Sequence, residues 1–165
     1  FSIARDQMAW GAAEASAAVS VIALANTFGR IFAGTLSDRL GRLPALSLGL
    51  SLSLLGLAAL ALSGPESRAL FYVGLAAVGL SFGSFMGVFP GYTAEVFGSR
   101  NNSVNFGIMF AGFSVAGIAG PALMGTLRAA GLGYPVCYLA GGLISAAGFL
   151  SILRLRSLRR RLSES

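Results

Sequence analysis

Long runs without a charged residue dominate the chain, and short charged segments separate them. Each run reaches or approaches the ~20 residues with which an α-helix spans a lipid bilayer. The pattern therefore predicts an all-α integral membrane helical bundle with five transmembrane helices. We expect the spans at about 15–36, 43–62, 69–89, 103–127 and 135–153, followed by a basic tail at 154–165.

Proline and the first residues of the chain suggest where these spans begin and end. Pro44 opens the second span at a first-turn position, where proline is tolerated. The third span is expected to stop near Pro90, because proline lacks the backbone N–H that a helix uses. The opening "FSIARDQMAWG" has the character of a connecting loop, so we expect either a fragment of a longer protein or a protein that lacks the earlier spans.

Composition supports the membrane class and excludes several kinds of chemistry. Hydrophobic residues make up 55% of the chain and charged residues 11%, against about 25% charged in soluble domains. There is no histidine, and Cys137 is the one cysteine. A disulfide framework within the chain and a zinc or haem site therefore have almost no material. We expect no metal, no cofactor and no enzymatic activity.

Arginine placement predicts the orientation in the membrane. The net charge of +6 arises from arginine alone, without lysine. If successive connections alternate sides, one side carries Arg39, Arg42, Arg100 and the arginines of the tail, and the other carries Arg5, Arg68 and Arg128. The positive-inside rule then places the tail in the cytoplasm. We expect the membrane to be a bacterial inner membrane. The same rule explains the basic tail without nucleic-acid binding.

Small residues recur every four positions on two of the predicted spans. The third span has Gly79, Gly83, Gly87 and Gly91, and the fourth has Gly112, Ala116 and Gly120. Such strips let two helix backbones approach closely within lipid. They predict helix packing; the alternative is that they are sliding surfaces of a transporter.

The segment "GTLSDRLGR", from Gly34 to Arg42, lies between the first two spans. Asp38 at the carboxyl end of a helix is unfavourable unless a positive group compensates it. The candidates are Arg39, Arg42 or the amino end of another helix. Gly34 would let that helix approach, and Gly41 suits a left-handed cap. Glu95 after the third span is either a latch to Arg39 or Arg42 at the cytoplasmic end, or a solvated charge.

Arg30 is a charge inside the first span, eight residues before Asp38. It is therefore roughly 12 Å deeper in the membrane, where an arginine costs on the order of 2.5–3.5 kcal/mol. Either it extends toward the surface or bonds another helix, or its guanidinium forms two parallel hydrogen bonds with a substrate carboxylate.

Other polar and apolar side chains accompany Arg30 in this hypothesis. Asn26 lies one turn earlier on the same face. Asn105, Met109 and Phe113 recur at four-residue spacing on the fourth span and offer a polar end and an apolar wall. Ordinary helix packing is the alternative for each of these residues.

The motif "GTLSDRLGR" resembles the cytoplasmic loop motif of the major facilitator superfamily. The resemblance implies that the chain is the last five spans of a twelve-span transporter, with a missing N-terminal half as its partner. Substrate would then bind between the halves and cross the bilayer by alternating access. The bilayer itself is the other expected partner.

Two longer segments, "ANTFGRIFAGTLSDRLGR" and "FPGYTAEVFGSRNNSVNFGIMFAGFSVAGIAGP", are similar to the oxalate/formate antiporter family and its monocarboxylate-carrier relatives. This resemblance implies that Arg30 contacts the substrate carboxylate. The family's second intramembrane cation, a lysine, corresponds to Phe113 here. A small organic monoanion such as formate or lactate is thus expected ahead of oxalate, by exchange or facilitated passage.

Two alternatives stay open at the level of sequence. One is a drug or metabolite effluxer that shares only the loop motif. The other is a non-transporting membrane anchor or partner subunit of a complex. Arg30 argues against the anchor, because a passive anchor gains nothing from a charge inside a span.

Overall fold

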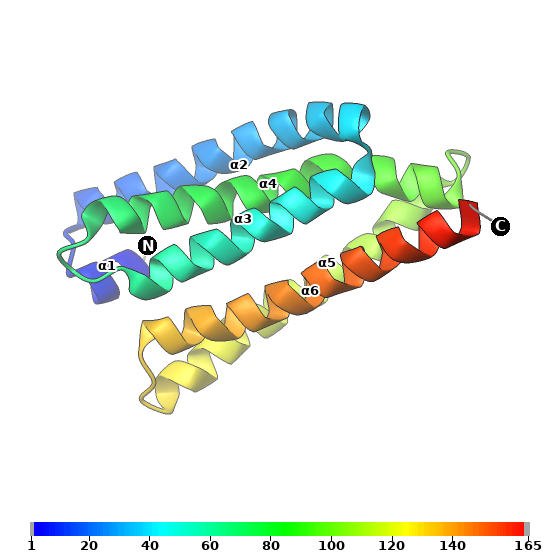
Figure 1. Cartoon of the computed structure of the whole chain (residues 1–165). Helices are drawn as coiled ribbons and strands as arrows, with labels where there is room; N and C mark the ends of the chain where they lie inside the picture. The colour runs from blue at the N-terminus through cyan, green and yellow to red at the C-terminus, as the bar shows by residue number, and fades with distance from the viewer. Residues whose placement is uncertain (1, 164–165) are drawn as a thin grey trace.

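The computed structural model describes residues 2–163, and every regular element in that range is an α-helix (Figure 1). The helices are α1 (Ser2–Met8), α2 (Ala12–Leu40), α3 (Arg42–Leu62), α4 (Arg68–Phe97), α5 (Asn102–Ala129) and α6 (Tyr134–Ser163). Five of them, α2 to α6, are long and apolar enough to cross a membrane. The predicted all-α membrane bundle is confirmed. Residues 164–165 of the predicted tail lie outside the described range.

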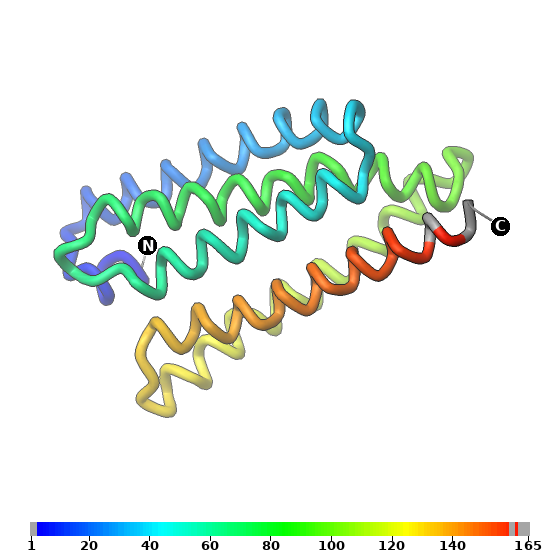
Figure 2. The backbone as a smooth tube through the Cα atoms, viewed as in Figure 1, coloured from blue at the N-terminus to red at the C-terminus, as the bar shows by residue number. Residues whose placement is uncertain are grey.

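The five long helices run roughly along one axis (Figure 1). Helix α4 packs on both α2 and α3, α6 packs mainly on α3, and α5 contacts α4 more than it contacts α6. The α2–α3 and α4–α5 connections lie at the same end as the carboxyl terminus, whereas α1 and the remaining connections lie at the opposite end (Figure 2). The predicted orientation in the membrane assumed this alternation, because it assigns the arginines of successive connections to opposite sides.

Several helix boundaries differ from the sequence prediction. The connection between α2 and α3 is the single residue Gly41, because both helices run through most of the predicted loop. The first residues form α1 where a loop was expected. The predicted tail continues α6 as far as Ser163, in keeping with the good helix propensity of arginine and leucine.

The expected end of the third span near Pro90 is wrong, since α4 continues through Pro90 to Phe97. Proline removes one backbone donor but leaves the rest of the helix able to form. Around it, the Thr93 hydroxyl donates to the Phe89 carbonyl at 2.8 Å, and Asn102 Nδ2 donates to the Pro90 carbonyl at 3.5 Å. Neither bond reaches the Met86 carbonyl, which is the acceptor that Pro90 leaves without its backbone donor. The second bond joins the start of α5 to α4.

Helix α4 packs closely on α2 through its glycine strip. A Cβ built on Gly79 would lie 2.9 Å from the Ile22 carbonyl oxygen, and one on Gly83 would lie 2.1 Å from that of Asn26. At Gly87 the nearest atom would be the Arg30 carbonyl oxygen at 2.5 Å. These distances leave no room for a methyl group. The two backbones therefore touch along the strip.

Helix α3 covers another side of α4, and α6 packs on α3. Ser81 donates to the Gly49 carbonyl at 2.7 Å, which joins α4 to α3. The hydroxyls of Ser53 and Ser145 lie 3.1 Å apart between α3 and α6. A Cβ at Gly148 of α6 would meet Leu50 of α3 at 3.5 Å. Small and hydroxylated residues thus mediate these contacts as well.

Helix α5 is the least enclosed of the long helices, and none of its residues is buried. A Cβ at Gly112 or Gly120 would have nothing within 4 Å, and Ala116 is exposed. The small-residue strip of α5 is therefore uncovered by the described part of the chain. That it packs against another helix stays a prediction.

At the end opposite the carboxyl terminus, α1 is bonded to α3 and α6. Gln7 Nε2 donates to the carbonyls of Leu60 at 3.2 Å and Ser63 at 3.0 Å, where α3 ends. Gln7 Oε1 accepts from the Tyr138 hydroxyl at 2.7 Å, and Asp6 accepts from Tyr134 at 2.9 Å. We call these contacts the α1 clasp. It connects α1 to the adjacent ends of α3 and α6.

Replacing Gln7 by methionine is expected to destabilise the protein by about 1–2 kcal/mol, because Tyr138, only 5% exposed, loses its acceptor. Thermal unfolding in detergent measures the effect. In the Tyr138→Phe background, Gln7→Met should lower the stability by less, because the Tyr138 hydroxyl that would lose its acceptor is already absent. Equal costs in both backgrounds would show that the bond between these side chains contributes nothing.

Candidate functional site

Arg30 lies on an exposed flank of α2, beside its contact with α4. Its Nε donates to Asn26 Oδ1 at 3.3 Å, one turn earlier. Its backbone is fixed against Gly83 and Gly87 of α4. Within residues 2–163 neither terminal nitrogen of the guanidinium has an acceptor, and no carboxylate forms an ion pair with it. The two terminal nitrogens of the exposed Arg30 guanidinium are therefore not engaged by the described helices.

The predicted residues of α5 face α4 in part. The Thr93 hydroxyl of α4 lies 3.2 Å from Met109 Sδ, and the ring of Phe113 lies 5.6 Å from that of Phe82. Asn105 is half-buried nearer the start of α5. The structure therefore places Met109 and Phe113 at the α4–α5 contact. No bond joins them to Arg30.

Phe82 is a residue that the sequence analysis missed. It is 36% exposed and stands one position before Gly83, which contacts α2. It lies amid a long apolar run of α4, and no periodicity distinguishes it from the neighbouring phenylalanines. Only the contact with Phe113 shows that it lies where α4 meets α5.

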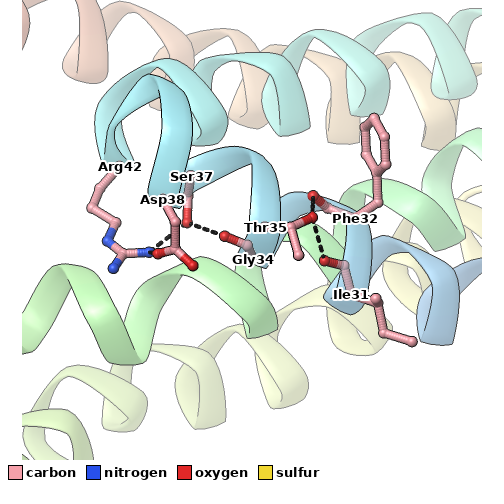
Figure 3. Close-up of polar contacts among 7 residues, drawn as sticks. All are labelled: Ile31, Phe32, Gly34, Thr35, Ser37, Asp38 and Arg42. Carbon is pink, nitrogen blue, oxygen red and sulfur yellow. Dashed lines mark hydrogen bonds and ion pairs between the residues drawn. The ribbon is translucent and has the colours of Figure 1, made fainter.

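The loop motif forms a compact polar cluster at the carboxyl-terminal end of α2 (Figure 3). Arg42 Nη1 lies 2.7 Å from Asp38 Oδ1, and it also donates to the Ser37 hydroxyl. Ser37 in turn donates to the Gly34 carbonyl at 2.8 Å. Of the partners considered for Asp38, Arg42 is the one with which it forms an ion pair. The Asp38 side chain is 65% exposed, so the pair positions the two helix ends more than it stabilises them.

Gly91 makes room for Arg42. A Cβ at Gly91 would lie 2.8 Å from Arg42 Cζ, so the guanidinium rests directly on the α4 backbone. The α4 strip thus has two kinds of contact. Gly79, Gly83 and Gly87 receive the α2 backbone, whereas Gly91 receives a cation. Gly34 is less confined, since its Cβ would lie 3.9 Å from the Gly87 carbonyl oxygen.

Arg39 and Glu95 are both exposed. Arg39 is in the last turn of α2, and Glu95 is near the end of α4. Since Arg42 already pairs with Asp38, a latch from Glu95 to Arg39 or Arg42 stays a prediction.

Gly41 turns the chain from α2 into α3 with φ 92° and ψ 161°. The positive φ agrees with the expected glycine requirement, but ψ differs from that of a left-handed cap. This region is essentially restricted to glycine. Its N–H donates to the Ser37 carbonyl at 3.0 Å, closing α2.

Gly41→Ala is therefore expected to destabilise the protein by about 1–3 kcal/mol, because alanine cannot adopt this conformation without strain. The measurement is thermal unfolding of the purified protein in detergent. Gly64→Ala is the matched control, since Gly64 is also in a connection and a Cβ there would meet nothing within 4 Å. A melting temperature equal to that of the control would contradict the strain argument.

A cavity of about 380 Å³ lies elsewhere, between α1 and the ends of the long helices next to it. Its lining includes Phe71, Leu75, Met124 and Ile144 and contains no charged residue. It does not suit an anion. Residues 2–163 also contain no group of three or more histidine, cysteine or acidic side chains that could hold a metal ion.

Five helices long and apolar enough to cross a membrane, with the Asp38–Arg42 ion pair where α2 joins α3, define a polytopic integral membrane protein. The sequence profile of the Major Facilitator Superfamily matches residues 1–165, so the chain belongs to that family.

The chain is also similar in sequence to a transporter of the same superfamily. The chain is 38% identical over 104 residues to the uncharacterized MFS-type transporter YhjX of Escherichia coli (strain K12). The alignment covers 63% of the chain and 26% of that protein, so the chain spans about a quarter of its relative's length. No solved structure matches the chain.

Proposed function

We propose that the chain is part of an alternating-access transporter that carries a small organic anion, with a short monocarboxylate such as formate or lactate as the simplest substrate. Family membership and the apolar helices support membrane transport in general. The substrate class rests on Arg30. In this proposal the anion binds between this part of the protein and an N-terminal half, in a bacterial inner membrane with the tail in the cytoplasm.

The observation that carries the proposal is the free fork of Arg30. The planar guanidinium has Asn26 on its Nε side, while its two terminal nitrogens have no acceptor in the described range. Two such donors match the two oxygens of a carboxylate. A charge that is kept at this depth of a span usually faces a cavity and serves transport.

No second cation and no acid accompanies Arg30 on this part of α2. The described acids are Asp6, Glu14, Asp38, Glu66 and Glu95, all near helix ends or in connections. A single positive charge favours a monoanion over a dianion such as oxalate. The same arrangement leaves this part of the protein without an intramembrane carboxylate for proton transfer, so exchange or facilitated passage is proposed.

The test is counterflow in liposomes that contain the full-length transporter. Vesicles loaded with unlabelled lactate or formate should accumulate the labelled anion from outside, and vesicles loaded with oxalate should do so less. Empty liposomes and a neutral sugar are the controls. If neutral or cationic drugs show counterflow and no carboxylate does, the proposal is wrong and the protein is instead a drug or metabolite effluxer.

A further inference from the structure

Arg30 and Phe82 lie on the same side of the α2–α4 pair, away from a cavity that α2, α3 and α4 share. Phe32 of α2, Ser84 of α4 and Gly49 of α3 line that cavity. Arg30 is two positions before Phe32, and Phe82 is two positions before Ser84. Two residues along an α-helix are rotated by about 200°. Both side chains therefore point away from this cavity.

An aromatic row extends from Phe82 along α5 on this side. The Phe82 ring lies 5.6 Å from Phe113, Phe113 lies 4.8 Å from Phe110, and Phe110 lies 5.4 Å from Phe106. Phe82 and Phe113 remain 36% and 40% exposed. We call these four residues the aromatic row. It forms an apolar wall that the described helices leave partly uncovered.

This side thus offers one cation at one edge and aromatic rings at the other. Arg30 with Asn26 comes from α2, and the aromatic row comes from α4 and α5. Formate and oxalate consist of carboxylate groups, and neither has an apolar group that could pack on the aromatic row. A ligand that matches both edges has a single carboxylate and a hydrocarbon part.

We propose that the transporter prefers monocarboxylates with an apolar substituent, such as a short alkyl chain or a phenyl ring, which packs on Phe82 and Phe113 while the carboxylate binds Arg30. This inference rests on the proposed function and specifies its substrate. Each methylene removed from water is worth roughly a fourfold gain in affinity. Aromatic rings add edge or offset contacts with the row.

The test is competition against labelled lactate counterflow in liposomes with the full-length transporter, at a pH near 8 where carboxylic acids are ionised. The competitors are formate, acetate, butyrate and phenylacetate. The inhibition constant is expected to fall by about fourfold per methylene from acetate to butyrate, with phenylacetate binding more tightly than formate.

Phe82→Ala should weaken competition by phenylacetate by about tenfold and leave that by formate within about twofold. Phe82→Leu keeps an apolar side chain and should retain part of the preference for phenylacetate over formate. It therefore shows whether the effect of Phe82→Ala arises from a folding defect. The matched control is Phe28→Ala, which removes a ring that is 64% exposed on α2 and outside the row.

Two other outcomes separate this inference from the proposed function. Lactate counterflow that depends on Arg30, with formate and phenylacetate competing equally, would overturn the apolar preference alone. An absence of carboxylate counterflow, or counterflow unchanged in Arg30→Gln, would overturn the proposed function and this inference with it.

Discussion

Arg30→Gln is expected to reduce carboxylate counterflow by about 100-fold or more, because removing one partner of a desolvated, hydrogen-bonded charge pair leaves the other charge unpaired. Glutamine keeps a polar group beside Asn26 but offers neither the positive charge nor the fork. The loss should appear in both affinity and maximal rate, since an occupied carrier closes around the anion.

Arg30→Lys separates charge from geometry. Lysine supplies a point charge but cannot form two parallel bonds, so about a tenfold loss with residual transport is expected. If the alternative interpretation were right and Arg30 only extended toward the membrane surface, lysine would replace it fully.

The matched control is Arg100→Gln, which removes an exposed arginine from the α4–α5 connection. Its counterflow should equal that of the wild type. All three variants should unfold at similar temperatures, because the Arg30 side chain is exposed and α2 packs on α4 through backbone. Wild-type counterflow in both Arg30 variants would remove this residue from the site.

Hydrophobic patterning was sufficient to predict the five spans, because a charge-free run of about 20 residues has few fates other than crossing a bilayer. The ends of the spans were harder to predict from the sequence. Pro90 marked a break that α4 does not have, since proline removes one backbone donor and the helix continues on the remaining bonds to Phe97. Whether a helix ends at a proline depends on its neighbours, which periodicity does not reveal.

The candidate site was predictable only where a residue is unusual for its surroundings. Arg30 stands out because a charge inside an apolar span is costly. Phe82 does not, because phenylalanine is ordinary in such a helix, and its proposed role depends on which helix lies beside it. The ion pair of Asp38 likewise required the structure, which distinguishes Arg42 from Arg39.

The four-residue spacing of glycines did not say which helix each strip would meet. In the structure Gly79, Gly83 and Gly87 of α4 meet the backbone of α2, whereas a Cβ at Gly112 or Gly120 of α5 would meet nothing within 4 Å. The same pattern thus has two different surroundings within one chain. Contact with α2 matters most at Gly83, because the atoms opposite it belong to Asn26 and Arg30.

Gly83→Ala is expected to have a large effect on both stability and transport. The added methyl group would lie 2.1 Å from the Asn26 carbonyl oxygen and 3.0 Å from the Arg30 backbone nitrogen. Backbone atoms cannot rotate away as a side chain can, so α2 as a whole must shift. Overpacking of this kind costs about 1–3 kcal/mol, and a bulkier Gly83→Leu should prevent folding.

The shift would also displace Arg30, because its backbone is part of the obstructing surface. Counterflow should therefore fall in Gly83→Ala even at temperatures where the protein remains folded. The measurements are thermal unfolding in detergent and lactate counterflow in liposomes.

Gly34→Ala is the sharpest control, because it makes the same change at the same helix pair. Its methyl group would lie 3.9 Å from the Gly87 carbonyl oxygen, an ordinary contact distance. Alanine is also the better helix former, so the melting temperature should be unchanged or slightly higher. Equal melting temperatures for the two variants would mean that α2 and α4 are not in backbone contact at Gly83. The position of Arg30 would then need another support.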